Sequence, residues 1–279
     1  MKKILKCLAA GFALCFGLFA FTACGDGQFS QANVNTNGNY TACNASDVAE
    51  TVNIEELQEQ NFGYKTTMKI NGTGYMLNST IIATVNEEGT LNTLAGKMVM
   101  DINMGGSFVK TNTEIYAPNN GYIYSNSNVS VPGLGAFQTK IKTNADFYSA
   151  FDELTNGMEN INVVQGFLDS YSSAGVTLEK AEVGNQTKFH LVVNDNEINS
   201  TLGNFDTNIW IVFEGGNFVG AKLEGKLDAS SSFDSESIID AKTSLDMNFS
   251  VEIVPFEGEI VLPGDLANYK EDPSHGMLN

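Results

Sequence analysis

Apolar and polar residues alternate over long stretches of this chain. In the clearest run, from 239 to 253, apolar side chains take the odd positions and polar side chains the even ones. Successive side chains of a strand point to opposite faces of a sheet, so this pattern predicts a strand with one buried and one wet face. Similar runs predict a broad antiparallel sheet of eight or so strands, at 64–71, 81–85, 97–104, 107–117, 121–125, 176–183, 187–193, 207–214 and 218–228.

Helical spacing of apolar residues is confined to short stretches. Asp47 and Glu50 have capping-box spacing ahead of an apolar face that extends to about residue 59. The stretches 144–156, 161–171 and 195–204 also favour helix. Because short helices cover little of a broad sheet, the sheet is expected to curl around them. The predicted fold class is α+β, a large curled antiparallel sheet (an incomplete or half β-barrel) that wraps a few short helices.

The N-terminus has the pattern of a bacterial lipoprotein export signal. Three lysines precede an apolar run from Cys7 to Ala20, about 14 residues long, which is too short to span a bilayer. The tetrapeptide Phe21-Thr22-Ala23-Cys24 follows where a lipobox ends in its modified cysteine. Cleavage before Cys24 and lipidation of its sulfur would anchor the chain to the cell membrane on the extracytoplasmic face.

This interpretation divides the chain into four parts. Residues 1–23 are the predicted signal peptide, and the Asn- and Gly-rich residues 24–45 a flexible tether that begins at the lipidated cysteine. Residues 46–263 form a single domain, and residues 264–279 a C-terminal tail. Cys43 is then the other cysteine of the mature chain. A Cys24–Cys43 disulfide is the competing interpretation, and it would abolish the anchor.

Charge and motif content narrow the possible functions. Without residues 1–23 the chain has 12 lysines, no arginine and 33 acidic residues, a formal net charge of −21, so binding of nucleic acid is not expected. His190 is predicted to be a surface histidine, and His190 and His275 do not have zinc-ligand spacing. The acidic residues between 195 and 240 lack the spacing of a calcium loop. No nucleophile, phosphate-binding or dinucleotide motif is present, so we expect neither an enzyme nor a bound metal or cofactor.

Two groups of apolar residues are candidates for contact with an apolar ligand. Methionine side chains adapt to irregular ligands, so Met68, Met98, Met100 and Met104, together with Trp210, are candidate cavity residues; a packed core is the alternative. The apolar segment 129–137 contains Val131, Leu134 and Phe137 and is predicted to be a lid or a membrane-touching tip. Its alternative is a loop folded back onto the core.

The order of these elements resembles a known family. The chain is similar to the half-barrel lipid-carrier lipoproteins of the LolA, LolB and LppX/LprG kind. The similarity rests on the lipobox, the helix at 47–59 before the strand from Tyr64, the strand–turn–strand at 113–124 and the closing Ile260-Val261-Leu262-Pro263. The resemblance implies an apolar cavity that holds acyl chains and passes lipids onward. Two functions therefore remain: a carrier or binder of a lipid or other apolar ligand, or a non-enzymatic surface interaction protein with a filled core.

Overall fold

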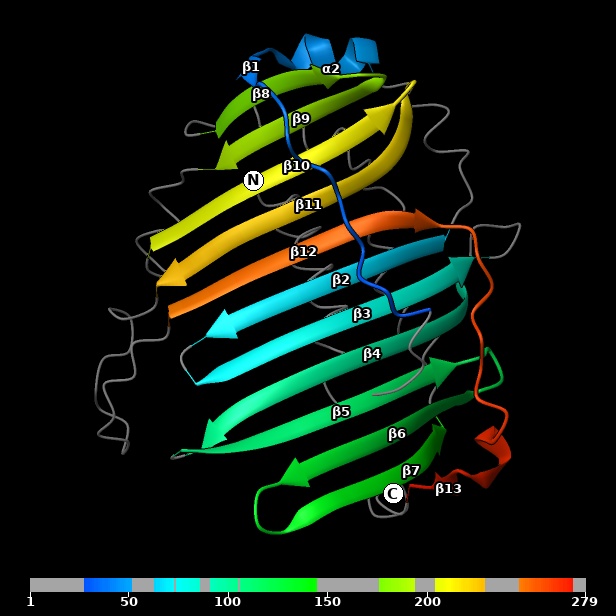
Figure 1. Cartoon of the computed structure of the whole chain (residues 1–279). Coiled ribbons are helices and arrows are strands. Elements are labelled where there is room, and N and C mark those ends of the chain that lie inside the picture. The colour runs from blue at the N-terminus through cyan, green and yellow to red at the C-terminus, as the bar shows by residue number, and fades with distance from the viewer. Residues whose placement is uncertain are drawn as a thin grey trace.

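The protein is built around one open, 13-stranded sheet. The computed structural model describes residues 28–51, 63–72, 74–85, 91–104, 106–144, 176–193, 204–228 and 246–272. Along the sheet the order is β1-β8-β9-β10-β11-β12-β2-β3-β4-β5-β6-β7-β13 (Figure 1). The strands are β1 (Thr41–Ala42), β2 (Gly63–Gly72), β3 (Tyr75–Val85), β4 (Leu91–Met104), β5 (Ser107–Ala117), β6 (Tyr122–Val131), β7 (Gly135–Asn144), β8 (Val176–Val183), β9 (Gln186–Val193), β10 (Asn204–Glu214), β11 (Asn217–Asp228), β12 (Asp246–Phe256) and β13 (Lys270–Glu271).

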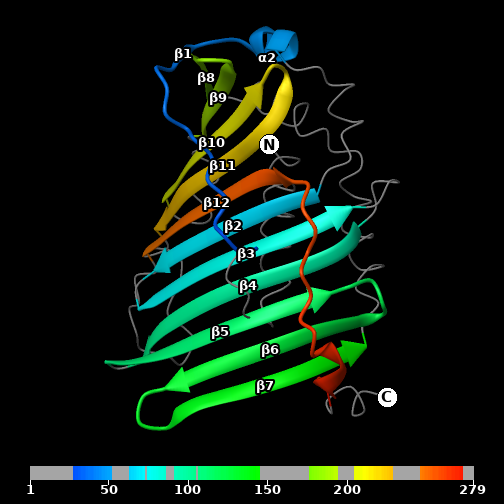
Figure 2. The ribbon, with the colours of Figure 1, turned by 45° about the vertical axis from the view of Figure 1, so that its right-hand side comes forward.

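Two meanders make up the sheet, one from β2 to β7 and one from β8 to β11, and β12 joins them by pairing with β11 and β2. The strands pair antiparallel apart from β13, which lies parallel to β7. Hairpins are tight where glycine supplies a positive φ, as at Gly74 (φ 83°) between β2 and β3. Figure 2 shows the twist that accumulates between the β7 and β8 ends of the sheet.

One face of the sheet carries the main apolar cluster, and we call it the apolar face. Phe249 and Val251 of β12 are 4% and 6% exposed in this cluster, while Glu252 points to the opposite side. The alternation expected for β12 is thus confirmed between 247 and 253, whereas 239–245 lie outside the described residues. The buried members of the cluster are Val48, Met68, Ile70, Leu77, Met98, Leu178, Phe189, Leu191, Ile209, Ile211, Phe213, Leu223, Phe249 and Val251.

The other face, called the polar face below, is crossed by both terminal segments. The N-terminal strap (residues 28–44) runs over the strands to the β8 edge, where it forms β1 (Figure 1). The C-terminal strap (residues 257–272) leaves β12, passes the strand ends and forms the 3-10 turn η1 (Leu266–Asn268) and β13 beside β7. Each strap therefore covers one sheet edge, which limits edge-to-edge association.

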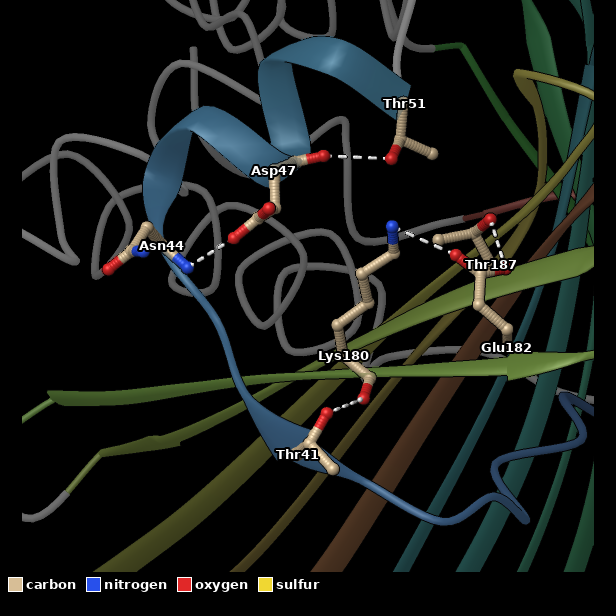
Figure 3. A network of polar contacts seen from close by, with 7 residues as sticks. All are labelled: Thr41, Asn44, Asp47, Thr51, Lys180, Glu182 and Thr187. Atoms are coloured by element: carbon tan, nitrogen blue, oxygen red, sulfur yellow. Dashed lines mark hydrogen bonds and ion pairs between the residues drawn. The ribbon is translucent and has the colours of Figure 1, made fainter.

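A short helix, α2 (Ala45–Thr51), follows the N-terminal strap directly. The backbone N–H of Asn44 donates to Asp47 Oδ2 at 2.6 Å, so Asp47 closes a capping box from inside the helix instead of preceding it (Figure 3). Beside it, Lys180 forms an ion pair of 2.8 Å with Glu182, which also accepts a hydrogen bond from Thr187. The helix begins two residues before Asp47, and its Val48 side chain packs in the apolar cluster.

The predicted α+β class is wrong. The described residues contain thirteen strands and a single α-helix of 7 residues, which lies at the β8 end instead of inside a curled sheet. The prediction assumed that helices lie against the sheet, but the longer described segments that lie against it are the two extended straps, which contact its polar face. The predicted helices at 144–156, 161–171 and 195–204 lie almost wholly outside the described residues. No helix in the described ranges is long and apolar enough to cross a bilayer.

Residues 28–44 differ most from their predicted state, a solvated tether. Phe29, Ala32 and Val34 are each only 6% exposed, so the strap belongs to the folded domain. The predicted C-terminal tail is likewise folded as far as Asp272, with Tyr269 3% exposed. Both segments are rich in polar residues, and their few apolar side chains find partners on distant strands.

Candidate binding face of the sheet

A single row of polar side chains crosses the polar face at right angles to the strands. Strand register aligns one residue from each of eleven neighbouring strands. In sheet order the row is Glu179, His190, Trp210, Lys222, Glu252, Thr67, Thr80, Lys97, Glu114, Asn126 and Lys140. Directly opposed residues have Cβ atoms about 5 Å apart, which allows hydrogen bonds and ion pairs along the row.

The centre of this row holds the N-terminal strap. Val34 N donates to Glu252 Oε2 at 2.7 Å, and Ala32 N donates to Thr67 Oγ1 at 2.8 Å. Thr67 and Glu252 are 2% and 9% exposed, so the strap satisfies polar groups that it also buries. The strap is thus bound through its backbone, by side chains of β2 and β12.

Lys188 of β9 binds the same strap through two hydrogen bonds. Its ammonium donates to the carbonyl oxygens of Asn35 and Asn37 at 2.8 and 2.9 Å, and the residue is fully buried. Burial lowers the pKa of Lys188 from its ordinary value. An ammonium buried in this way requires its hydrogen-bond acceptors, so the strap and Lys188 depend on each other.

His190 is not the surface residue that the sequence suggested. Its side chain is 14% exposed, and its ring stacks on Trp210 with the centroids 4.6 Å apart and the planes 2° apart. Nδ1 lies 3.0 Å from Glu179 Oε2, and Nε2 lies 3.0 Å from Asn208 Oδ1. Tyr40 of the strap approaches the same ring at 5.3 Å. All these contacts hold the ring in place, so His190 orients Asn208 instead of facing open solvent.

Asn208 also lines a groove on the polar face, beside the row. The groove has a volume of about 390 Å³, within the range of about 300–1,000 Å³ usual for ligand sites. It is lined by Lys69, Asn71, Asn208, Glu224, Gly225, Lys226, Asn248, Phe249 and Ser250. Carboxamides and a hydroxyl supply both donors and acceptors. Glu224 pairs with Lys222 at 2.6 Å, and Lys69 and Lys226 are the other charged residues of the lining.

A second cluster forms under the C-terminal strap, at the other end of the row. Glu114 is 2% exposed, accepts a hydrogen bond from Asn126 Nδ2 at 3.4 Å, and leaves its buried Oε1 without a described partner. Burial raises the pKa of Glu114 to about 7, although hydrogen bonds from Tyr116 and Asn126 favour its ionised form. The ring of Tyr269 packs edge-on against Tyr124 at 5.7 Å. Asp265 pairs with Lys140, so side chains bind this strap over the face of the sheet, while β13 pairs through its backbone with β7 at the edge.

The structure brings together three of the predicted cavity residues, Met68, Met98 and Met100, but not the others. Met68 and Met98 are buried in the apolar cluster and Met100 packs against it, whereas the Met104 side chain lies outside the description. Trp210 is on the opposite face, stacked on His190. Val131, Leu134 and Phe137 belong to the β6–β7 hairpin, and the last two are 73% and 55% exposed at its tip. The segment 129–137 is therefore a hairpin whose tip is not folded onto the core.

The strap bears on the Cys24–Cys43 disulfide, which is the competing interpretation of the cysteines. Cys43 bonds through its N–H to Leu178 of β8, while Ala32 bonds to β2, five strands or about 24 Å away. Position 24 lies within about 14 Å of Gln28, at the far end of the strap. A disulfide needs Cα atoms within about 7 Å, so Cys24 cannot pair with Cys43 in this fold. Burial raises the pKa of the Cys43 thiol to about 11, which disfavours a reactive thiolate.

Positive charge is concentrated on the polar face. Of the ten lysines in β2 to β12, only Lys180 has a register position on the apolar side. The others are Lys65, Lys69, Lys97, Lys110, Lys140, Lys142, Lys188, Lys222 and Lys226. No group of three potential metal ligands occurs in the described part of the chain. The alternation of apolar and polar residues in the sequence predicts which side chains lie on this face. It does not predict the row, because the row depends on the register between strands.

Comparisons with known proteins give little further guidance. No protein-family model and no curated protein sequence matches the chain. Among solved structures, a porin-like protein from Bacteroides uniformis is 9% identical, with 70% of this chain and 96% of that chain covered and a TM-score of 0.20. MucB in complex with MucA(peri) is 12% identical, with 77% and 95% covered and a TM-score of 0.14. The Pseudomonas aeruginosa MucA/MucB complex is 11% identical, with 77% and 94% covered and a TM-score of 0.14. TM-scores this low do not establish a shared fold, so the resemblance to lipid-carrier lipoproteins stays a prediction.

Proposed function

We propose that this protein is a non-catalytic binding protein, anchored by a lipidated Cys24 to the extracytoplasmic face of the cell membrane. Its ligand is an uncharged polar chain that contacts the groove on the polar face. The groove carries this proposal, because it gathers three carboxamides and a hydroxyl in one hollow. A chain of N-acetylated sugars offers the hydroxyl and amide groups that such side chains bind.

The sequence pattern supports the anchor. The lipobox precedes Cys24, and the strap keeps Cys43 out of its reach, so the thiol is available for lipidation. Labelled fatty acid should be incorporated into the wild type and into Cys43→Ser, but not into Cys24→Ser.

Carriage of a lipid is the competing function. It requires an apolar hollow, whereas the groove among the described residues is lined mainly by polar residue types, and the predicted lining residues lie on two faces and a hairpin tip. Native mass spectrometry of the purified protein, with lipid extraction, tests it directly. A stoichiometric co-purified lipid would favour the carrier over the polar-ligand proposal.

A calorimetric titration with an N-acetylated oligosaccharide tests the groove itself. Asn248→Leu removes a carboxamide from the floor of the groove and should weaken binding at least tenfold, since unpaired ligand groups are costly to bury. Asn128→Leu changes an exposed residue on the same face, in β6 and outside the groove, and should bind like the wild type. Saturable binding of a fatty acid with no response to any polar oligosaccharide would overturn the proposal.

A further inference from the structure

Folding of the N-terminal strap changes the length of chain between the anchor and the sheet. A free tether from Cys24 to residue 45 would reach about 70 Å when extended, because each residue spans at most about 3.3–3.6 Å. In the structure the strap is bound from Gln28 onward, which leaves four residues and a reach of about 14 Å. Whatever is attached to Cys24 must therefore lie close to Gln28.

Gln28 is held in place by the C-terminal strap. Its side chain bonds twice to the backbone of Val261, with Nε2 donating to the carbonyl oxygen at 3.0 Å and Oε1 accepting from the N–H at 2.8 Å. The next residue, Phe29, is buried against Tyr116, with ring centroids 6.5 Å apart. The two straps thus meet here, at the strand ends along which the C-terminal strap runs (Figure 1).

One exposed apolar side chain, Val261, marks this meeting point. Val261 is 69% exposed and stands within the sequence Ile260-Val261-Leu262-Pro263, the other members of which are half-buried. The charged residues nearby include the exposed Glu257 and Glu259 and also Lys65, whose ammonium bonds to Ser30 and lies 5.6 Å from the ring of Phe256.

We propose that the segment 257–263 of the C-terminal strap rests on the membrane surface, so that the strand ends beside it face the lipid and the groove faces away from it. This inference rests on the lipidated Cys24 of the proposed function. It fixes an orientation, because groove residue Asn248 lies eight residues along β12 from Phe256, or about 26 Å. The ligand site would then open toward the extracytoplasmic space.

Two equally exposed apolar residues make a matched test. Val261 is 69% exposed near the anchor, and Leu134 is 73% exposed at the β6–β7 tip, at the opposite strand ends (Figure 2). Each is changed to Cys in the lipidated, full-length protein with Cys43→Ser, and labelled with an environment-sensitive fluorophore. The protein is reconstituted into phosphatidylcholine vesicles that contain a spin-labelled lipid as quencher.

We expect the label at 261 to be quenched at least threefold more than the label at 134. Inserting ten Gly/Ser residues after Gly27 should abolish the difference without loss of vesicle flotation, because the chain then reaches much further. Flotation with equal quenching at both positions, or stronger quenching at 134, would overturn the orientation alone. Failure of the wild type to float with the vesicles would overturn the anchor, and the orientation with it.

Discussion

The two terminal straps cover the same face of the sheet by different means. The N-terminal strap presents its backbone, and buried side chains of β2, β9 and β12 bind it. The C-terminal strap presents side chains, chiefly Tyr269 and Asp265, which pack against Tyr124 and pair with Lys140. The N-terminal strap thus depends on its backbone and on the buried Phe29, Ala32 and Val34, none of which ionises, whereas the C-terminal strap also depends on an ion pair.

The largest effect is expected at Lys188, which the N-terminal strap requires. Lys188→Ala removes the ammonium that donates to the carbonyl oxygens of Asn35 and Asn37, and should lower the free energy of unfolding by about 3–5 kcal/mol, since each lost bond has a charged donor. Urea denaturation measures this loss, and hydrogen exchange should show reduced protection of the Val34 amide. Lys226→Ala, at an exposed lysine on the same face, should change stability by less than about 0.5 kcal/mol. Equal losses in the two variants would mean that Lys188 does not hold the strap.

The C-terminal strap should be the pH-sensitive one of the two. The pKa of Glu114 is raised from 4.5 to about 7 in the folded state, so the folded protein holds an extra proton between these values. This contribution to stability is complete below pH 4.5 and is lost as pH rises through about 7. Glu114→Gln imitates the protonated form and should be more stable than the wild type by about 2–3 kcal/mol at pH 8, with little difference at pH 4.

Melting curves at a series of pH values test this prediction, and hydrogen exchange locates the effect. Protection of residues 265–272 should decrease from pH 5 to pH 8 in the wild type but not in Glu114→Gln, after correction for the intrinsic exchange rate. The Val34 amide should keep its protection in both proteins. A parallel loss at both straps would remove the distinction between them.

The smallest effect is expected where the straps touch. Gln28→Ala removes two hydrogen bonds at an exposed site and should cost about 1 kcal/mol or less. Gln28→Glu keeps the acceptor for Val261 N–H but loses the donor, and should have an intermediate effect. A loss above about 2 kcal/mol in denaturant would show that the straps fold as one unit, contrary to their separate modes of attachment.

The alternation of apolar and polar residues in the sequence was sufficient to locate much of the sheet. The strands β2, β5, β8, β9 and β11 overlap the predicted runs closely, and Phe249 and Val251 of β12 are buried on the predicted side. The hairpin at 129–137 was missed because its apolar residues and glycines resemble a loop. Its turn, with Gly133 at φ 80° and Gly135 at φ 93°, allows β6 and β7 to extend up to the tip.

The sequence by itself determined which residues alternate, where several strands and the short helix lie, and that the N-terminus has the pattern of a lipoprotein signal. Only the tertiary structure decided that residues 28–44 form a strap, since Thr67 and Glu252, which bind it, are 35 and 218 positions from their partners. The polar row and the groove likewise exist only after register aligns the strands. The physical reason is that alternation is a local property of one strand, whereas register and strap binding depend on contacts between segments far apart in the chain.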